Sequence, residues 1–461
     1  MDSSDLAYAG LARQADLVAA GEVSARELVD VCLSRIEVID PTVNAYRVVF
    51  AERARMEADQ ADARRRAGAA ERPLLGVPVA IKDDVDVAGE VTAFGTDAHG
   101  PPVTSDAEVV RRLRQAGAII LGKTNVPELT ILPFTETPTY GKTRNPWDLQ
   151  RTPGGSSGGS GAAVAAGMAG AALGSDGAGS IRIPAGCCGL FGLKPQRGRV
   201  PMAPVEDGWR GLTVLGPITR TVADTARFFD AVKDGGPSFA EAAARVPGRL
   251  RIAVSTKVPP PLTVKVAPEQ LQAVQDTAAL LRGLGHDVVE RDPEYGMAFV
   301  SVLARYLRGI HDAADAMPHP ERLSRLTRGY ARLGSRIPVA AVARARAAEA
   351  GDRERLNRVF ADGFDVMLTP TFTRGQLRIG EYEGRGVQWT LNGTGRWVPH
   401  LGAFNHTGQP AAAVPAGFAS DGLPLSVQLV GRPDDEPTLL SLAAQMEAER
   451  PWADRRPAHA P

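Results

Sequence analysis

The chain has 461 residues with 53 basic and 53 acidic side chains, so its formal charge is balanced. A balanced charge argues against a general electrostatic attraction to nucleic acid or to a membrane surface. Cys32, Cys187 and Cys188 are too few for a disulfide framework, which favours a cytoplasmic, reducing setting. The first residues lack a basic start followed by an apolar core, so no signal peptide is expected, and the longest apolar run is shorter than the ~18 residues of a membrane span.

Residues 1–70 are predicted to form helices. Residues 6–20 have helical periodicity, and Ser24 with Glu27 fits a capping box that opens a second helix. Residues 51–69, rich in Ala, Arg and Glu, predict an exposed third helix.

Beyond residue 70 the predicted strands alternate with helices. Short apolar runs predict strands at residues 77–81, 118–121, 250–254, 287–289, 365–368, 411–414 and 425–430. Periodic runs predict helices at residues 106–116, 269–284, 300–360 and 439–450. This alternation is typical of an α/β sandwich. No linker long or polar enough to separate domains is present, so we expect one domain over residues 1–461, with a variable helical and loop region at about 240–400 that shapes the substrate pocket.

Residues 154–195 carry two serine-bearing glycine clusters, around Ser156 and Ser180, with no histidine between them. Glycine-rich backbone lets N–H groups approach a reacting atom closely. A serine nucleophile in this segment therefore needs a base other than a neighbouring histidine, and Ser–Lys pairs are one known solution.

Lys82, which follows the apolar run at residues 77–81, is the candidate base. A lysine base must be neutral, and burial lowers the pKa of a lysine. Asp83 and Asp84 would oppose this shift if they lay close. On a continuing strand Asp83 faces away from Lys82 but Asp84 does not. An ordinary structural lysine is the alternative interpretation.

Two other motifs are weaker. Residues 117–124 match the P-loop pattern, but the letters between the glycines are the predicted strand itself, which argues against nucleotide binding. Residues 154–158 match the G-x-S-x-G elbow of α/β-hydrolases, which needs a downstream histidine, and His406 is the best candidate. No HExxH motif or Cys/His cluster is present, so we expect no metal and no cofactor.

Several segments resemble the amidase signature family in order and spacing: GVPVAIKDDVDVAG, GKTNVPEL, RTPGGSSGGSGAAVAAG and GSDGAGSIRIPAGCCGLFGLKPQRGRVP. FNHTGQPAAAVPAGF and LPLSVQLVGRP resemble its closing strands. The resemblance covers nearly the whole chain and is weakest from about 235 to 400. It implies an α/β/α sandwich with a mixed, twisted central β-sheet, and hydrolysis of a carboxamide C–N bond through an acyl-enzyme.

The resemblance also implies roles for single residues, as a Ser-cisSer-Lys triad. Ser180 is the expected nucleophile, Ser156 is the bridging serine after a cis peptide bond, and Lys82 is the base that takes the proton through Ser156. The expected oxyanion hole consists of the N–H groups of Gly177, Ala178, Gly179 and Ser180. The expected supporting residues are Gly155, Asp176 and Arg182.

Two residues differ from those usual in parts of the family. Many members have glycine at the position of Ala178, whose methyl group restricts φ and could crowd the acyl site. The tRNA-dependent amidotransferase A subunits usually have Gln at the position of Ile183. Ile183 therefore favours a free-standing amidase, similar to aryl acylamidases and cyclic amide hydrolases. The alternatives are a glutamine-dependent amidotransferase subunit that delivers ammonia to a partner, and a non-catalytic binding protein on the same fold.

The expected partner is a small-molecule amide, with no nucleic acid and no membrane, and a homodimer is the assembly we consider. Candidate linings of the acyl pocket are residues 130–135 and the loop with Tyr382, Trp389 and Trp397. Ordinary packing is an equal alternative for each of these aromatic side chains.

Overall fold

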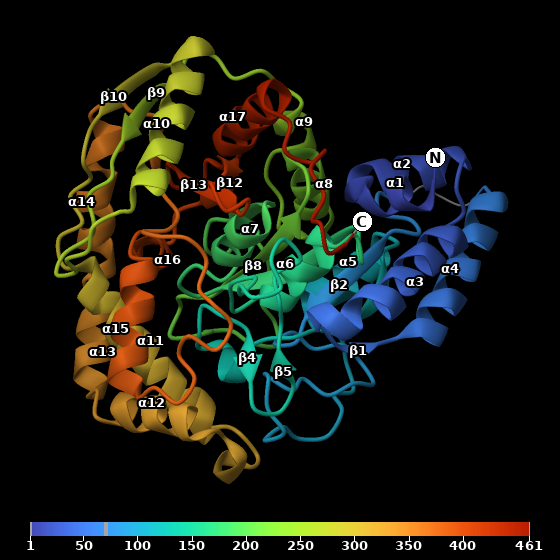
Figure 1. The fold of residues 1–461 in the computed structure, drawn as a ribbon, viewed down its shortest axis with the longest axis horizontal. Helices are drawn as coiled ribbons and strands as arrows, with labels where there is room; N and C mark the ends of the chain where they lie inside the picture. Colours follow the sequence, from blue (N-terminus) through green and yellow to red (C-terminus); the bar gives the residue numbers. More distant parts are fainter. Residues whose placement is uncertain (1, 69–71, 461) are drawn as a thin grey trace.

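A computed structural model describes residues 2–68 and 72–460 (Figure 1). An 11-stranded sheet has the order β1-β3-β2-β6-β8-β7-β12-β13-β11-β9-β10. Its strands are β1 (Tyr46–Val49), β2 (Pro78–Lys82), β3 (Ile119–Thr124), β6 (Ala171–Asp176), β7 (Phe191–Lys194), β8 (Val214–Thr219), β9 (Arg251–Val254), β10 (Asp287–Glu290), β11 (Val366–Pro370), β12 (Ala411–Phe418) and β13 (Pro424–Gly431). The short strands β4 (Glu136–Thr137) and β5 (Gly141–Lys142) pair separately.

The central sheet is mixed. The pairs β2–β3, β2–β6, β9–β10 and β9–β11 are parallel. The pairs β1–β3, β6–β8, β7–β8, β7–β12, β12–β13 and β11–β13 are antiparallel. The predicted α/β fold with a mixed sheet is therefore confirmed.

Helices follow the strands along the whole chain. In the first half they are α1 (Ser3–Tyr8), α2 (Gly10–Ala20), α3 (Ala25–Val43), α4 (Ala51–Arg66), α5 (Glu108–Gln115), α6 (Gly158–Ala165), α7 (Arg182–Cys188) and α8 (Val222–Val232). In the second half they are α9 (Phe239–Ala243), α10 (Pro268–Gly283), α11 (Ala298–Asp315), α12 (Arg325–Ser335), α13 (Val339–Ala347), α14 (Glu349–Ala361), α15 (Val387–Trp397), α16 (Gly402–Thr407) and α17 (Glu436–Glu449). Two 3₁₀ turns lie at Glu128–Thr130 and Pro320–Arg322.

The apolar core has two large clusters, one on each face of the sheet. Val79 and Ile81 of β2 belong to one cluster, whereas Ala80 between them belongs to the other. This alternation follows from the two-residue repeat of a strand. Helices α5, α8, α10 and α17 contribute to the first cluster, and α3, α4, α6 and α7 to the second. The sheet is thus covered by helices on both faces.

The N-terminal segment differs from the all-helical prediction. The helix expected over residues 6–20 is interrupted near Gly10, which has φ +76°. Tyr46–Val49 forms β1, an edge strand that pairs with β3. Its sequence YRVV is rich in β-formers, but four residues are too short to give a clear periodicity. Figure 1 shows this segment at one end of the molecule and α11–α15 at the other.

Small residues let α6 approach the sheet closely. A Cβ at Gly159 would lie 2.4 Å from the Ala45 carbonyl oxygen and 2.5 Å from the Asn125 nitrogen. A Cβ at Gly158 would lie 2.2 Å from Thr135 Oγ1. The glycine-rich segment is therefore required for packing as well as for the site at its start.

Within the described ranges, none of the helices has the length and apolar character needed to span a bilayer.

Candidate active site

Lys82 is the last residue of β2, and its side chain is fully buried. Because β2 and β6 are parallel neighbours, their carboxyl ends meet at one edge of the sheet. Lys82 Nζ donates to Ser156 Oγ at 2.7 Å and to Ser175 Oγ at 2.6 Å. The structure thus brings together two residues that lie 74 positions apart in the sequence.

Ser156 precedes α6, and its side chain is buried. The Gly155–Ser156 peptide bond is cis, as the family resemblance implies for this position. Gly155 fits here because a Cβ would lie 2.7 Å from the Phe134 nitrogen. The Ser156 hydroxyl faces Lys82 on one side and lines a cavity on the other.

Ser180 lies in the loop between β6 and α7 and lines the same cavity as Ser156. Unlike Ser156 it is partly exposed. Among the described residues, no direct hydrogen bond joins the Ser180 hydroxyl to Ser156. In ligand-free enzymes such hydrogen bonds often tighten only when substrate binds.

A buried ion pair holds this loop. Arg182 Nη2 donates to Asp176 Oδ1 and Arg182 Nε to Asp176 Oδ2, both at 3.0 Å. Arg182 also donates to Asn405 Oδ1 at 2.6 Å and Gln428 Oε1 at 2.6 Å. Asn405 in turn donates to Asp176 Oδ1 at 2.8 Å. Burial opposes ionisation of Asp176, but Arg182 and Asn405 outweigh it and lower the pKa of this carboxyl group.

The Asp176 carboxylate also binds the loop backbone. It accepts the Gly179 N–H at 2.6 Å and the Ile181 N–H at 3.2 Å. The structure therefore uses the Gly179 N–H differently from the expectation, which assigned it to the oxyanion hole. Gly179 has φ +126°, whereas Ala178 is not in the left-handed region, so alanine is tolerated at position 178.

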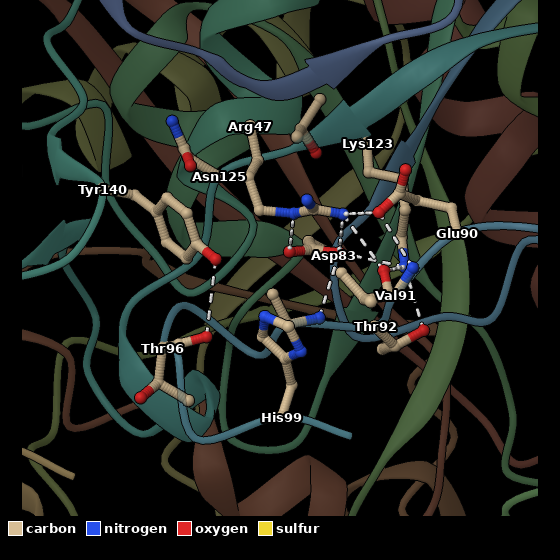
Figure 2. A network of polar contacts seen from close by, with 12 residues as sticks. Arg47, Asp83, Glu90, Val91, Thr92, Thr96, His99, Lys123, Asn125 and Tyr140 are labelled. Atoms are coloured by element: carbon tan, nitrogen blue, oxygen red, sulfur yellow. Dashed lines mark hydrogen bonds and ion pairs between the residues drawn. The ribbon is translucent and has the colours of Figure 1, made fainter. Parts of the chain in front are cut away.

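The two aspartates after Lys82 point in different directions. Figure 2 shows Arg47 and Lys123 turned toward Asp83, with Nε–Oδ2 and Nζ–Oδ1 distances of 2.6 Å and 2.9 Å. Asp84 Oδ2 instead lies 3.2 Å from Lys82 Nζ. This is the arrangement that strand alternation predicts, and it settles which aspartate can act on Lys82.

The environment of Lys82 lowers the pKa of its ammonium group. Burial is the largest cause, because it penalises the charged form. Asp84 and Asp176 act in the opposite direction without cancelling the effect of burial. A lowered pKa increases the fraction of neutral amine, the form that can accept a proton.

Ser180 lies where two cavities meet. The larger, of about 730 Å³, has a mixed lining, in which the polar side chains of Asp84, Asp86, Ser156 and Ser180 lie among apolar ones such as Phe94, Met202 and Leu215. The smaller, of about 160 Å³, is mainly apolar. It is lined by side chains from the segment after the 3₁₀ turn Glu128–Thr130 and from α7, α11 and α15, among them Ile131, Leu132, Ile183, Phe299, Val302, Leu303 and Leu391. Ser156 lines the larger cavity and is not part of the smaller one.

The expected pocket residues are only partly placed in these cavities. Thr130 to Pro133 do line the apolar cavity. Tyr382, Trp389 and Trp397 do not line it, so of the two interpretations left open for them the structure supports ordinary packing or exposure. Trp397 is buried against Phe372, Tyr382 stacks on Phe134, and Trp389 is 63% exposed. Helix α15 contributes Leu391 and Thr394 instead. These residues were not predicted, because the sequence does not reveal which face of this helix meets the site.

The side chains on which the competing motifs depend have other partners. Residues 119–124 of the P-loop match form β3, and Lys123 of this match pairs with Asp83. His406 is buried between Asp352 and Arg305, with nitrogen–oxygen and nitrogen–nitrogen distances of 3.0 Å and 2.9 Å. In the described part of the chain no group of three or more His, Cys, Asp or Glu could hold a metal ion.

Sequence reasoning missed two residues of the site, Ser175 and Asn405. Ser175 stands directly before Asp176 in the motif that was singled out, so its position at the end of β6 could have indicated it. Asn405 precedes His406 in FNHTGQPA and comes from α16, 229 residues from Asp176. No local pattern connects it to the loop.

The cysteines lie away from solvent. Cys187 and Cys188 end α7, directly behind the Ser180 loop, and all three cysteines are free and buried. Burial raises the pKa of Cys32 to about 12. All three cysteines therefore pack as small apolar side chains.

Comparison with known proteins agrees with this architecture. The sequence profile of the family described as Amidase matches residues 27–440. The chain is 58% identical over 462 residues to the protein named "Putative amidase AmiB2" of Mycobacterium tuberculosis (strain ATCC 25618 / H37Rv), covering 99% of both. It is 36% identical to the 6-aminohexanoate-cyclic-dimer hydrolase of Pseudomonas sp. (strain NK87), covering 96% of this chain and 95% of that one.

A solved structure of 6-aminohexanoate cyclic dimer hydrolase complexed with substrate superposes with a TM-score of 0.88 at 32% identity, over 99% of this chain and 100% of that one. The fold and the comparisons define a hydrolase that acts on carbon–nitrogen bonds other than peptide bonds. The chain belongs to the amidase signature family.

Proposed function

We propose that this protein hydrolyses small-molecule amides through an acyl-enzyme on Ser180, with Ser156 as proton relay and Lys82 as base. The observation that carries the proposal is the 2.7 Å hydrogen bond between Ser156 Oγ and Lys82 Nζ, a buried group whose pKa is lowered. Such a pair supplies what a serine nucleophile lacks, a nearby acceptor for its proton.

In the first step the Ser180 oxygen attacks the amide carbonyl carbon. Its proton passes to Ser156, which gives its own proton to the Lys82 amine. When the tetrahedral intermediate collapses, the C–N bond breaks and the proton returns through Ser156 to the leaving nitrogen. Water then repeats the sequence on the ester, which releases the acid and restores the Ser180 hydroxyl.

The negative oxygen of the intermediate needs backbone donors. We assign this role to the N–H groups of Gly177, Ala178 and Ser180, which belong to the loop held by Asp176 and Arg182. Gly179 keeps its bond to Asp176 and so fixes the shape of the loop. Preorganised donors of this kind stabilise a developing charge because they need no reorganisation during the reaction.

The two cavities then bind different parts of the substrate. Ser156 must deliver a proton to the leaving nitrogen, and it lines only the larger cavity. The amine therefore leaves on that side, and the acyl group occupies the apolar cavity between α7, α11 and α15. This placement favours amides with an apolar acyl chain. Two of the relatives are named as hydrolases of the cyclic dimer of 6-aminohexanoate, in which a methylene chain stands on both sides of the amide bond.

Ser180→Ala tests the proposal. The variant should keep the thermal transition of the wild type and lose about 10⁴-fold or more in kcat on acyl anilides. A fluorophosphonate should label the wild type on the peptide that contains Ser180, as measured by mass spectrometry. A folded Ser180→Ala variant with normal turnover would contradict the mechanism.

A further inference from the structure

The mechanism above leaves two neighbours of Lys82 without a role. Ser175 Oγ accepts from Lys82 Nζ at 2.6 Å and donates to Asp84 Oδ2 at 2.6 Å. Asp84 Oδ2 itself lies 3.2 Å from Lys82 Nζ, and the Asp84 side chain is 10% exposed. Lys82, Ser175 and Asp84 thus form a closed triangle of polar contacts, and Ser156 is a further polar neighbour of the Lys82 nitrogen.

This triangle matches the hydrogen-bonding capacity of an amine. A neutral amine has two N–H bonds and one lone pair, whereas an ammonium has three N–H bonds and no acceptor. If the two N–H bonds of neutral Lys82 point to Ser175 Oγ and Asp84 Oδ2, its lone pair faces Ser156 Oγ. After proton transfer the third N–H bond points to Ser156, so each donor has an acceptor in both states.

The charge of Asp84 matters because the ammonium forms in a buried place. A buried cation without an anion is strongly destabilised. Two carboxylates influence Lys82, and one of them, Asp176, is already paired with Arg182 at 3.0 Å. Asp84 Oδ1, by contrast, has no hydrogen-bond partner among the described residues. Asp84 is thus the anion whose charge is available to Lys82.

We propose that Asp84 and Ser175 are positioning residues of the reaction: they aim the neutral Lys82 amine at Ser156 and stabilise the ammonium that forms there. The inference rests on the proposed function. No proton moves to Asp84 in this scheme. The proton of Ser180 still passes to Ser156 and that of Ser156 to Lys82, and both return when the amine leaves.

Asp84→Asn is the decisive variant, because it keeps the shape and removes the charge. Lys82 must be neutral to act, so activity falls on the acid side as Lys82 becomes protonated. The Asp84 carboxylate raises the pKa of Lys82, so its loss should lower that pKa. We expect the acid limb of the kcat/KM profile to move down by about one pH unit, a tenfold change in proton affinity. We also expect kcat on the plateau to fall.

Asp86→Asn is the matched control. Asp86 lines the same cavity two residues further on, but its carboxylate accepts from Thr92 Oγ1 and not from Lys82. Its acid limb should stay at the wild-type pH. A folded Asp84→Asn variant with an unmoved limb would overturn the proposal, as would an equal shift in both variants.

Ser175→Ala provides a second route should Asp84→Asn fail to fold. Losing one acceptor for the ammonium should move the acid limb in the same direction, and the limb can be read from the pH dependence of fluorophosphonate inactivation. An unmoved limb contradicts the proposal here too. Retained turnover in Ser180→Ala would instead refute the proposed function, so the two failures are distinguishable.

Discussion

Gly179 shows how one residue determines the geometry of the Ser180 loop. Its φ of +126° lies outside the range that residues with a side chain readily adopt. Its N–H group binds Asp176, and an added Cβ would lie 2.6 Å from Leu401 Cδ1 and 3.0 Å from Ile183 Cδ1. Ala178, the neighbouring residue, does not have a positive φ, and its N–H group is not bound to Asp176. This explains how alanine can replace the more common glycine at position 178.

Gly179→Ala should therefore impair catalysis much more than an ordinary Gly→Ala change. Misplacing the proposed oxyanion donors should reduce kcat by about 100-fold or more, the range seen when such a donor is lost. Steady-state kinetics on an acyl anilide would measure the loss. Gly198→Ala is the control, since Gly198 also has positive φ but a Cβ there meets nothing within 4 Å. Equal losses in both variants would show that backbone strain alone is responsible.

At the scale of elements, α11 forms one wall of the apolar cavity. It contributes Phe299, Val302, Leu303 and Tyr306, whereas Val300 on the same helix is 45% exposed. The size of the cavity, about 160 Å³, limits the acyl chains that fit. Selectivity for the acyl group should thus depend on this helix as well as on Ala178 of the Ser180 loop, which lines the same cavity.

Val302→Phe is expected to narrow the cavity. The ratio of kcat/KM for a hexanoyl anilide over an acetyl anilide should fall at least tenfold, which corresponds to about 1.4 kcal/mol of binding in the transition state. Val300→Phe, on the exposed face of α11, should leave this ratio as it is. If both variants discriminate alike, the acyl chain does not lie between α11 and α15.

Local sequence patterns were enough to predict the strand that carries Lys82. They were not enough to predict which side chains of α15 and α16 lie around the site. Lys82 could be placed at the end of a buried strand because its apolar run is short and continuous. For Tyr382, Trp389 and Trp397 the choice between packing and pocket lining stayed open, because an aromatic residue in the sequence does not indicate which way its side chain faces. Asn405 could not be found, since its contact with Asp176 depends on packing between segments 229 residues apart.

At the scale of the whole molecule, carboxyl groups shielded from water couple stability to pH. Glu447 of α17 accepts the Val222 N–H at 3.0 Å, and its Oε1 lacks a partner among the described residues. Burial raises the pKa of Glu447 to about 8 and that of Asp224 to about 6. Both groups therefore hold a proton in the folded chain at pH values where the unfolded chain has released it.

The contribution of these two carboxyl groups to the free energy of unfolding should accordingly fall as pH rises. Between about pH 5 and pH 8 each of them can bind a proton in the folded chain that it has released in the unfolded chain, and one such proton lowers the slope of the unfolding free energy against pH by about 1.4 kcal/mol per pH unit. Glu447→Gln should reduce this slope, as measured by urea unfolding at several pH values. Glu449→Gln, an exposed change on the same helix, should retain it. A wild-type slope in Glu447→Gln would show that this carboxyl group is not the cause.

The meeting of two cavities at Ser180 has a consequence for the order in which products depart. In the proposed mechanism the amine occupies the wider cavity and is free as soon as the C–N bond breaks, whereas the acyl chain remains covalently attached in the narrow one. Departure of the amine clears the wider cavity next to Ser156, where the attacking water must be activated. Release is thus sequential by construction: amine first, then entry of water, and the acid last.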